Sequence, residues 1–243
     1  MQVLIDLIRS TQGIDLPVKK VVMGANWTFV QSLTCGLAST QKQPPPHYKQ
    51  KIRDVGLLQQ KNSQELAQFA LSDVWLEASL GIATINSMID IPVDQCKNEN
   101  AFYTLCRKGA DKKVAIVGHF PFVEKLKPLV KELFVLELNP RAGDIHADQA
   151  QSILPQCDVI GISGTTLINH TFDQVLQHCR KDAFKIMIGP STPMTPVLFD
   201  HGIDVVAGSR VIEPDSVYRE IAQGANFNQL HGVQVLTMSR DRR

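Results

Sequence analysis

Three side chains in the second half of the chain could bind a cation or move a proton. His119 follows Gly118 at the end of an apolar run, where an imidazole can ligate a metal or transfer a proton near neutral pH. Glu137 ends the next apolar run, and Asp144 follows in the loop after it. Because imidazole nitrogen and carboxylate oxygen suit a borderline or harder divalent transition metal, we predict His119, Glu137 and Asp144 as metal ligands. Hydrogen bonding of His119 to the neighbouring loop is the competing interpretation.

The position of Glu137 also indicates a second kind of ligand. An acidic side chain at the end of the second strand of a parallel sheet often accepts hydrogen bonds from a ribose. The first loop is not GxGxxG, however, and His119, Phe120 and Phe122 stand where a pyrophosphate would need bare backbone. Ordinary dinucleotide binding is therefore disfavoured, whereas a nucleoside-like or other small polar ligand stays open.

Further polar side chains follow later apolar runs or lie on a helix of the first half. Their hydroxyls, amides and neighbouring N–H groups could bind a ligand, although helix capping and tight helix packing are the structural alternatives. The predicted ligand-binding set comprises His119, Glu137, Thr165, Asn169, Ser191, Glu77 and Asn86. No GxSxG elbow surrounds a serine of this set, which disfavours a hydrolase nucleophile.

The elements that would position these residues are five short apolar runs separated by helix-length segments. They occupy residues 114–117, 134–136, 159–162, 186–188 and 205–207. Such spacing predicts βα units and a parallel sheet, whose ligands lie outside the carboxyl ends of the strands. A strand order of 3-2-1-4-5 would place the crevice between the loops at Gly118 and Gly189. An order of 2-1-3-4-5 would place it between the loops at Gly118 and Ser163.

The first half has a different pattern and indicates an α+β arrangement. We predict a helix over 3–9, strands over 18–23 and 27–33, a small-residue turn over 35–38, and helices over 62–71 and 73–88. Residues 41–47 are predicted as loop, because Pro44, Pro45 and Pro46 remove three ladder donors. Two domains follow, an α+β domain over 1–108 and an α/β domain over 109–243 that ends in a short tail. Residues 233–236 are predicted as an edge strand.

Composition narrows the class of protein further. The 243 residues carry a net charge of +1, which gives no argument for binding nucleic acid. No apolar run approaches the ~20 residues of a membrane helix, and no signal-peptide pattern opens the chain, so we expect the cytoplasm. Five scattered cysteines form no CxxC pair and are predicted as ordinary packing thiols: Cys35, Cys96, Cys106, Cys157 and Cys179. Assembly into a homo-oligomer stays open.

Five of these motifs, in this order, resemble the family named "putative heavy-metal chelation". They begin at Gly81, Val117, Glu137, Ile162 and Gly189, and together span almost the whole chain. The resemblance implies an N-terminal domain similar to the enolase N-terminal fold, a Rossmann-like C-terminal domain and a site in the cleft between them. The metal role implied by the family name is itself a proposal.

The leading hypothesis is therefore a protein that binds a small polar ligand, a metal ion or a metal chelate in the cleft between the two domains. Soft-metal chelation is disfavoured, because thiolates are the preferred ligands of soft ions and no cysteine lies in the five loops. No cofactor is assigned beyond a divalent transition metal ion. The alternative is a transferase or lyase using a nucleoside-type cofactor such as S-adenosylmethionine. A third hypothesis is a chaperone-like or regulatory binding module without chemistry.

Overall fold

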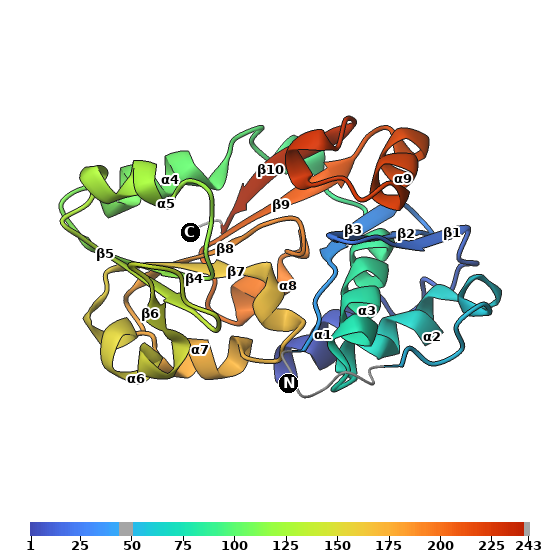
Figure 1. Cartoon of the computed structure of the whole chain (residues 1–243), viewed down its shortest axis with the longest axis horizontal. Coiled ribbons are helices and arrows are strands. Elements are labelled where there is room, and N and C mark those ends of the chain that lie inside the picture. The colour runs from blue at the N-terminus through green and yellow to red at the C-terminus, as the bar shows by residue number, and fades with distance from the viewer. Residues whose placement is uncertain (44–50, 241–243) are drawn as a thin grey trace.

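The five apolar runs of the second half form strands of one mostly parallel sheet, which confirms the predicted α/β class. The computed structural model describes residues 1–43 and 51–240. Its seven-stranded sheet has the order β10-β9-β8-β7-β4-β5-β6, and only β10 runs antiparallel to its neighbour (Figure 1). In chain order the strands are β4 (Lys113–Val117), β5 (Glu132–Glu137), β6 (Ile145–His146), β7 (Val159–Ser163), β8 (Phe184–Ile188), β9 (Val205–Val211) and β10 (Val233–Ser239).

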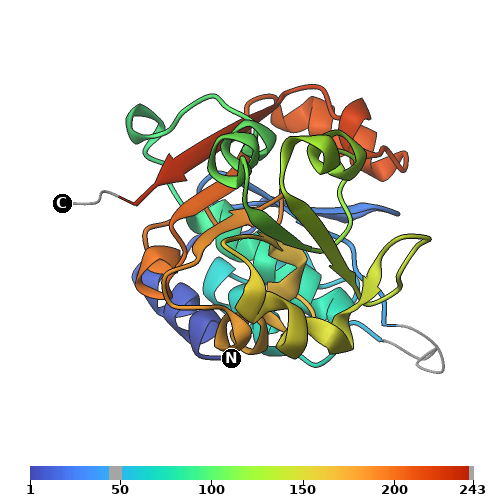
Figure 2. The ribbon, with the colours of Figure 1, turned by 90° about the vertical axis from the view of Figure 1, so that its left-hand side faces the viewer.

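Helices cover both faces of this sheet. Figures 1 and 2 show α4 (Ala101–Gly109) and α5 (Val123–Leu126) on one face. The opposite face carries α6 (Ala150–Ile153), α7 (Phe172–His178) and α8 (Val197–Asp200). The strands between them are apolar on both faces, as parallel strands buried on two sides usually are. All five residues of β7 are buried, for example.

The strand order resolves the two alternatives left open by the sequence. The five predicted strands follow the order 2-1-3-4-5, because β4 lies between β5 and β7. The chain leaves β4 toward β5 on one side and returns to β7 on the other, so the topological switch point lies between β4 and β7. The crevice is therefore expected where the loops at Gly118 and Ser163 meet.

The first half forms a smaller, antiparallel sheet with helices packed beside it, as the α+β prediction requires. Strands β1 (Lys20–Met23), β2 (Trp27–Gln31) and β3 (Cys35–Ser39) pair in that order. The helices are α1 (Gln2–Ser10), α2 (Ser63–Ala67) and α3 (Trp75–Met88). Helix α3 is buried on nearly all sides, because β2, β3 and α2 all contact it.

The prediction of a turn over residues 35–38 is wrong, because these residues form β3. Small residues suggested a turn, but they are needed here for close packing. A Cβ added at Gly36 would lie 2.0 Å from the carbonyl oxygen of Ala83 in α3. The glycine therefore allows the strand to contact the helix backbone directly.

The two halves share their hydrophobic contacts and lie side by side (Figure 1). Helix α1 packs against α8, so the first element of the chain contacts the second half. Helix α9 (Pro214–Ala222) covers the small sheet, where Phe29 and Leu37 join Val217 and Ile221 in one buried cluster. The arrangement of the small sheet is thus fixed by elements from both ends of the chain.

The remaining predictions concern the ends of segments and the division of the chain. The proline-rich loop at Pro44–Pro46 and the tail at 241–243 lie outside the described residues. The division into 1–108 and 109–243 stays a prediction; helix α4, just before it, contacts β7 and β8 of the large sheet. Strand β10 confirms the predicted edge strand. Over the described parts of the chain, none of the helices has the length and apolar character needed to span a bilayer.

Replacing Gly81 in the middle of α3 should destabilise the protein. A Cβ there would lie 1.9 Å from the backbone nitrogen of Ala70, and this neighbour cannot move as a side chain can. Gly81→Ala should therefore lower the free energy of unfolding by more than about 2 kcal/mol, although alanine normally favours a helix over glycine by about 1 kcal/mol. Urea denaturation measures the change.

Gly109→Ala is the matched control for this substitution. The Cβ added at Gly109 would meet only side-chain methyl groups, at 2.8 Å from Val114 and 3.1 Å from Val130. Its destabilisation should be clearly smaller. Equal effects of the two substitutions would contradict the close packing of α3 on the backbone at Ala70.

Candidate functional site

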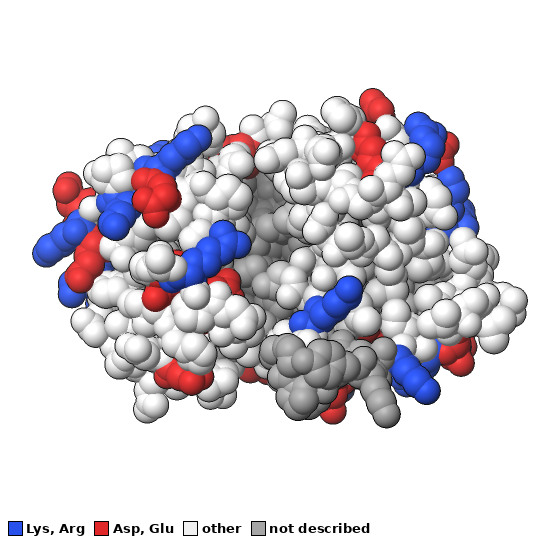
Figure 3. Space-filling view, in the orientation of Figure 1, with Lys and Arg blue, Asp and Glu red and all other residues white. Residues whose placement is uncertain are grey.

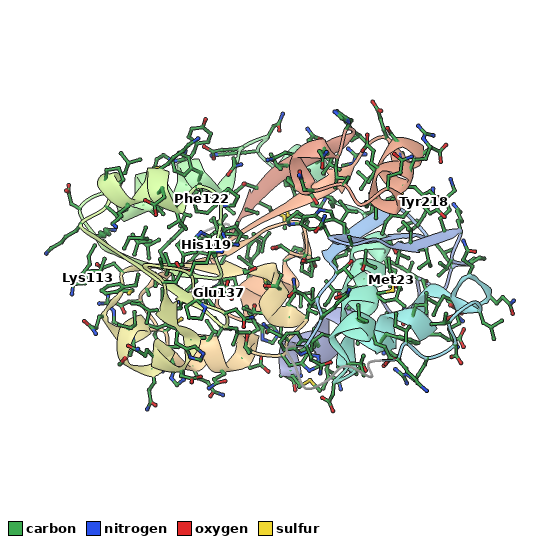
Figure 4. The ribbon with its side chains drawn as sticks, viewed as in Figure 1. Met23, Lys113, His119, Phe122, Glu137 and Tyr218 are labelled. Carbon is green, nitrogen blue, oxygen red and sulfur yellow. The ribbon has the colours of Figure 1, made fainter. Side chains whose placement is uncertain are left out.

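The carboxylate of Glu137 is bound by backbone N–H groups at the carboxyl ends of β4 and β5. The N–H of His119 donates to Oε2 at 3.0 Å, and the N–H of Leu138 donates to Oε1 at 2.7 Å. The two amides orient the carboxylate and satisfy part of its hydrogen-bonding capacity. Figure 4 shows His119 and Glu137 close together, as the sequence pattern predicts.

Gly118 makes this arrangement sterically accessible. Its N–H donates to the carbonyl of Leu136 at 2.8 Å, and its φ of +105° lies in the left-handed region that side chains other than hydrogen disfavour. A Cβ at Gly118 would also lie 2.9 Å from the Cβ of Ser163 at the end of β7. The glycine therefore turns the chain toward Glu137 and lets the loops after β4 and β7 approach one another.

The imidazole of His119 is paired with Asp144. Nδ1 lies 3.0 and 2.9 Å from the two carboxylate oxygens, and the Asp144 side chain is only 3% exposed. The loop before Asp144 closes on itself, because the N–H of Arg141 also donates to this carboxylate. A carboxylate only accepts hydrogen bonds, so Nδ1 carries a proton, and in the neutral ring Nε2 then presents a lone pair. His119 is thus suited to ligate one metal ion or accept one proton through Nε2.

A pocket opens beside Glu137, below the carboxyl ends of β4, β5 and β7. We call it the carboxyl-edge pocket; it encloses about 840 Å³ including its open mouth, and all of its lining residues fall within 117–178. About 170 Å³ of this space is cavity volume in the usual sense, and the rest is open to solvent. Its polar lining comes mainly from Glu137, Gln151, Ser163, Thr165, Asn169 and Gln174. The molecule is hollowed in the middle of the face drawn in Figure 3, and Figure 4 shows His119 and Glu137 beside that place in the same orientation.

Two further predicted residues line this pocket. The hydroxyl of Thr165 lies 2.8 Å from that of Ser163 and belongs to the short helical turn Gly164–Leu167. Asn169 accepts hydrogen bonds from the N–H and hydroxyl of Thr171 through Oδ1. Local hydrogen bonds therefore occupy part of the hydrogen-bonding capacity of Thr165 and Asn169, as expected if these residues cap helical turns.

The other predicted residues do not line the pocket. His119 and Asp144 stand outside its lining and pair with one another, although His119 directly follows the lining residue Gly118. The remaining three have partners elsewhere. Ser191 is buried and accepts from the N–H of Ser39, which links the loop after β8 to β3. Glu77 binds Arg53 and Ser72 within the first half. Asn86 donates to the carbonyl of Leu37 at 2.8 Å, and this bond joins α3 to β3. Their role as ligand-binding residues stays a prediction, now beside an observed structural role for each.

The sequence reasoning missed the amides of Gln151 and Gln174. Both line the pocket from helices α6 and α7 rather than from a loop after a strand. The residues predicted in the second half all follow strand ends, so helix residues that lie below the sheet are not among them. A glutamine on a short amphipathic helix has no sequence signal that separates such a position from a solvent-exposed one.

The His, Cys, Asp and Glu side chains of the described residues do not come together as ligands for a heavy-metal ion. Among residues 1–43 and 51–240, no group of three His, Cys, Asp or Glu side chains could hold a metal ion. Asp144 is close to His119, but His146 pairs with Asp148 on the surface. Side chains of the described chain alone therefore do not fit a heavy-metal centre.

The cysteines are also unsuited to soft-metal binding. Burial is the main cause that raises the pKa of Cys35 and Cys157 to about 11 and that of Cys179 to about 12. Burial likewise raises the pKa of Cys96 and Cys106. Since the thiolate is the metal ligand, these free thiols are poorly prepared for it.

The fold and the site together define a two-part α/β protein with a polar pocket at the carboxyl edge of its parallel sheet. The chain belongs to the family described as "Putative heavy-metal chelation". One model of that description, DUF364, matches residues 100–239, and a second, DUF4213, matches residues 5–89. These two matches correspond closely to the large and small sheets.

Similar proteins extend this likeness over nearly the whole chain. An uncharacterized protein of Methanocaldococcus jannaschii is 32% identical over 162 residues, which cover 64% of this chain and only 62% of that protein. A crystal structure of a DUF364 protein of unknown function from Desulfitobacterium hafniense is 25% identical, with a TM-score of 0.84 and 98% of each chain covered. A second, from Pyrococcus horikoshii, is 20% identical, with a TM-score of 0.84, and covers 98% of this chain and all of its own. The fold is therefore shared over almost the full length.

Neutralising Glu77 should weaken the fold in a pH-dependent way. Burial alone would raise the pKa of Glu77, but hydrogen bonds from Arg53 and Ser72 lower it below the ordinary 4.5. A lowered folded-state pKa adds stability that is present above the unfolded value and lost as the pH falls through the folded value. Glu77→Gln should thus cost about 1–3 kcal/mol at pH 7 and progressively less below pH 4.5, as urea denaturation across pH can measure.

Glu65→Gln is the matched comparison, because Glu65 is exposed and only completes the capping box of Asn62 at the start of α2. Its loss should be smaller at pH 7. A Glu77→Gln variant with unchanged stability and weakened ligand binding would instead support the predicted ligand-binding role of Glu77.

The native thiols should react slowly with a thiol reagent such as DTNB at pH 8. Their raised pKa values leave little thiolate, and the reaction rate follows the thiolate fraction and access. We expect all five cysteines to react in guanidinium chloride at least about tenfold faster than in the folded protein. A native thiol that reacts as fast as in the unfolded chain, and that Cd²⁺ protects, would contradict this reading of the cysteines.

Proposed function

We propose that this protein binds a small polar ligand in the carboxyl-edge pocket. The observation that supports this most strongly is the Glu137 carboxylate, which two backbone N–H groups orient at the carboxyl ends of β4 and β5, one strand from the switch point between β4 and β7. Ligands of open α/β sheets bind at this place. The surrounding hydroxyls and amides of Thr165, Asn169 and Gln174 can donate and accept hydrogen bonds to a polar molecule.

A metal ion would bind to this protein as cargo, in a complex that already supplies some of its ligands. The protein offers one well-oriented nitrogen, Nε2 of His119, because Asp144 binds the opposite side of the ring. A single imidazole cannot chelate an ion by itself. It can complete the coordination of a metal complex whose other ligands come from a small organic chelator, and the function named for the family would then be the capture of a metal chelate.

We also propose a cytoplasmic location and a small-molecule partner. Free cysteines without a disulfide are usual in a reducing compartment such as the cytoplasm. The near-neutral net charge of +1 continues to favour small-molecule over nucleic-acid partners.

Calorimetric titration with Ni²⁺ and Zn²⁺, each alone and as the 1:1 complex with histidine, tests the cargo proposal. The complex keeps coordination positions free for His119, and its organic part can also hydrogen-bond to the polar pocket lining. It should therefore bind at least about tenfold more tightly than the bare ion, a difference of about 1.4 kcal/mol. His119→Ala should remove this preference. Asp144→Asn should weaken it by about tenfold, because the partner of a metal-ligating histidine orients its ring.

His146→Ala is the matched control for the His119 substitution. This ring is 46% exposed and pairs with Asp148, away from the buried Asp144 carboxylate. It should leave binding unchanged. NMR shifts of the Leu138 and Thr165 amides should accompany binding; bare ions that bind as well as their complexes, or shifts confined to other residues, would contradict the proposal.

A further inference from the structure

The Glu137 carboxylate retains acceptor capacity on the side of the pocket. A carboxylate offers about four lone-pair positions, and the backbone N–H groups of His119 and Leu138 take one on each oxygen. A ligand group that binds the remaining positions must donate hydrogen bonds. Two adjacent hydroxyls satisfy both oxygens at once, and an acidic side chain at the end of the second parallel strand is where a ribose diol is commonly bound.

The charges of the pocket disfavour a ligand with phosphate groups. Its lining includes the carboxylates of Glu137 and Asp148. Among the residues that the structure describes, the ring of His178 is the one titratable nitrogen group of this lining, and no lysine or arginine belongs to it. Phosphate groups bind in proteins mainly to arginine, lysine, metal ions or exposed backbone N–H groups. A phosphate placed here would meet negative charge without a cation among the lining side chains.

The protein also fills the place that a phosphate would need above the sheet. The ring of Phe120 lies against both glycines that follow β4 and β8: its carbons lie 3.5 Å from a Cβ position at Gly118 and 3.8 Å from one at Gly189. Phe122 stacks on the same ring at 5.2 Å between ring centroids. Aromatic carbon therefore covers the bare backbone that phosphate-binding loops present to their ligand.

The rest of the pocket suits a planar heterocycle. Leu138, Ala150 and Val175 provide apolar surface, and the amides of Gln151 and Gln174 lie in the same lining. Asn169 uses Oδ1 for Thr171, so its amide nitrogen is the atom that can serve a ligand acceptor. Apolar walls with a few amides are typical of sites that bind a base by stacking and edge hydrogen bonds.

We propose that the carboxyl-edge pocket takes a ribonucleoside-type ligand without phosphate groups, whose two ribose hydroxyls donate to Glu137. The proposal rests on the proposed function, since it names the class of ligand for the same pocket. It requires neither a metal nor a reaction. Base identity is decided by Gln151, Gln174 and Asn169, and the set of probes below covers purines and pyrimidines.

Calorimetry and amide NMR with the wild-type protein test this proposal without any substitution. The probes are adenosine, guanosine, cytidine and uridine, with the 2′-deoxy, 3′-deoxy and 5′-monophosphate forms of whichever binds. At least one ribonucleoside should bind and shift the Leu138 and Thr165 amides. Loss of either hydroxyl should weaken binding by about 10- to 100-fold, as for hydrogen bonds to a charged group. The monophosphate should bind more weakly than the nucleoside.

Two substitutions at opposite ends of β5 provide a matched pair. Glu137→Gln should weaken the ribonucleoside and leave its deoxy form nearly unaffected. Glu132→Gln should change neither, because Glu132 begins β5 at the end away from the pocket and pairs with Lys113. Deoxy forms that bind as tightly as the ribonucleoside, or a monophosphate that binds more tightly, would overturn the proposal even if Glu137→Gln fails to fold.

The outcomes separate this inference from the proposed function. If the Ni²⁺–histidine complex shifts the pocket amides and no nucleoside does, the nucleoside inference alone is wrong. If neither kind of probe perturbs Leu138, Thr165 or Asn169, both proposals are wrong. If a nucleoside binds with shifts confined to residues outside 117–178, the pocket assignment fails for it.

Discussion

The hydrogen bonds between Glu137 and the two backbone N–H groups connect the ends of β4 and β5 and determine the geometry of the candidate site. They form only because Gly118 takes a left-handed conformation that directs the next N–H toward the carboxylate. His119, which supplies this N–H, also places its ring against Asp144, so it is fixed through both its backbone and its imidazole. One residue thus links two carboxylates with different tasks. Glu137 lies in the pocket, and Asp144 is nearly buried and orients a ring.

The first half contributes to this site indirectly, through the shared core. No described residue before 117 lines the carboxyl-edge pocket. Ser39 nevertheless binds the loop after β8, and that loop packs against Gly164 at the end of β7. A Cβ at Gly164 would lie 2.8 Å from the backbone nitrogen of Thr192. The small sheet therefore supports the loop next to the pocket, and its packing on α9 supports the small sheet in turn.

The sequence predicted the parts of the fold that depend on local pattern. Apolar runs at helix-length spacing specify parallel strands, and a carboxylate after the second strand must lie near the loop after the first once those strands pair. Partners far apart in sequence could not be predicted. Glu77 and Asn86 are polar residues on an apolar helix, and nothing local indicates that Arg53 and the carbonyl of Leu37 meet them. Gly36 suggested a turn because glycine is common in turns. Its contact with the backbone of α3, which requires a glycine there, arises only in three dimensions.

The function named for the family and the chemistry of this chain can be reconciled through the source of the metal ligands. Soft ions require thiolates, and burial keeps the cysteines of this chain protonated. The ordered donors are instead one imidazole nitrogen, one pocket carboxylate and several neutral hydroxyls and amides. Such a set recognises the organic part of a ligand well and a bare ion poorly, because each neutral donor adds little to metal affinity while it adds shape and hydrogen-bond specificity. Selectivity should therefore reside in the organic molecule, and the choice of metal should follow from what that molecule carries.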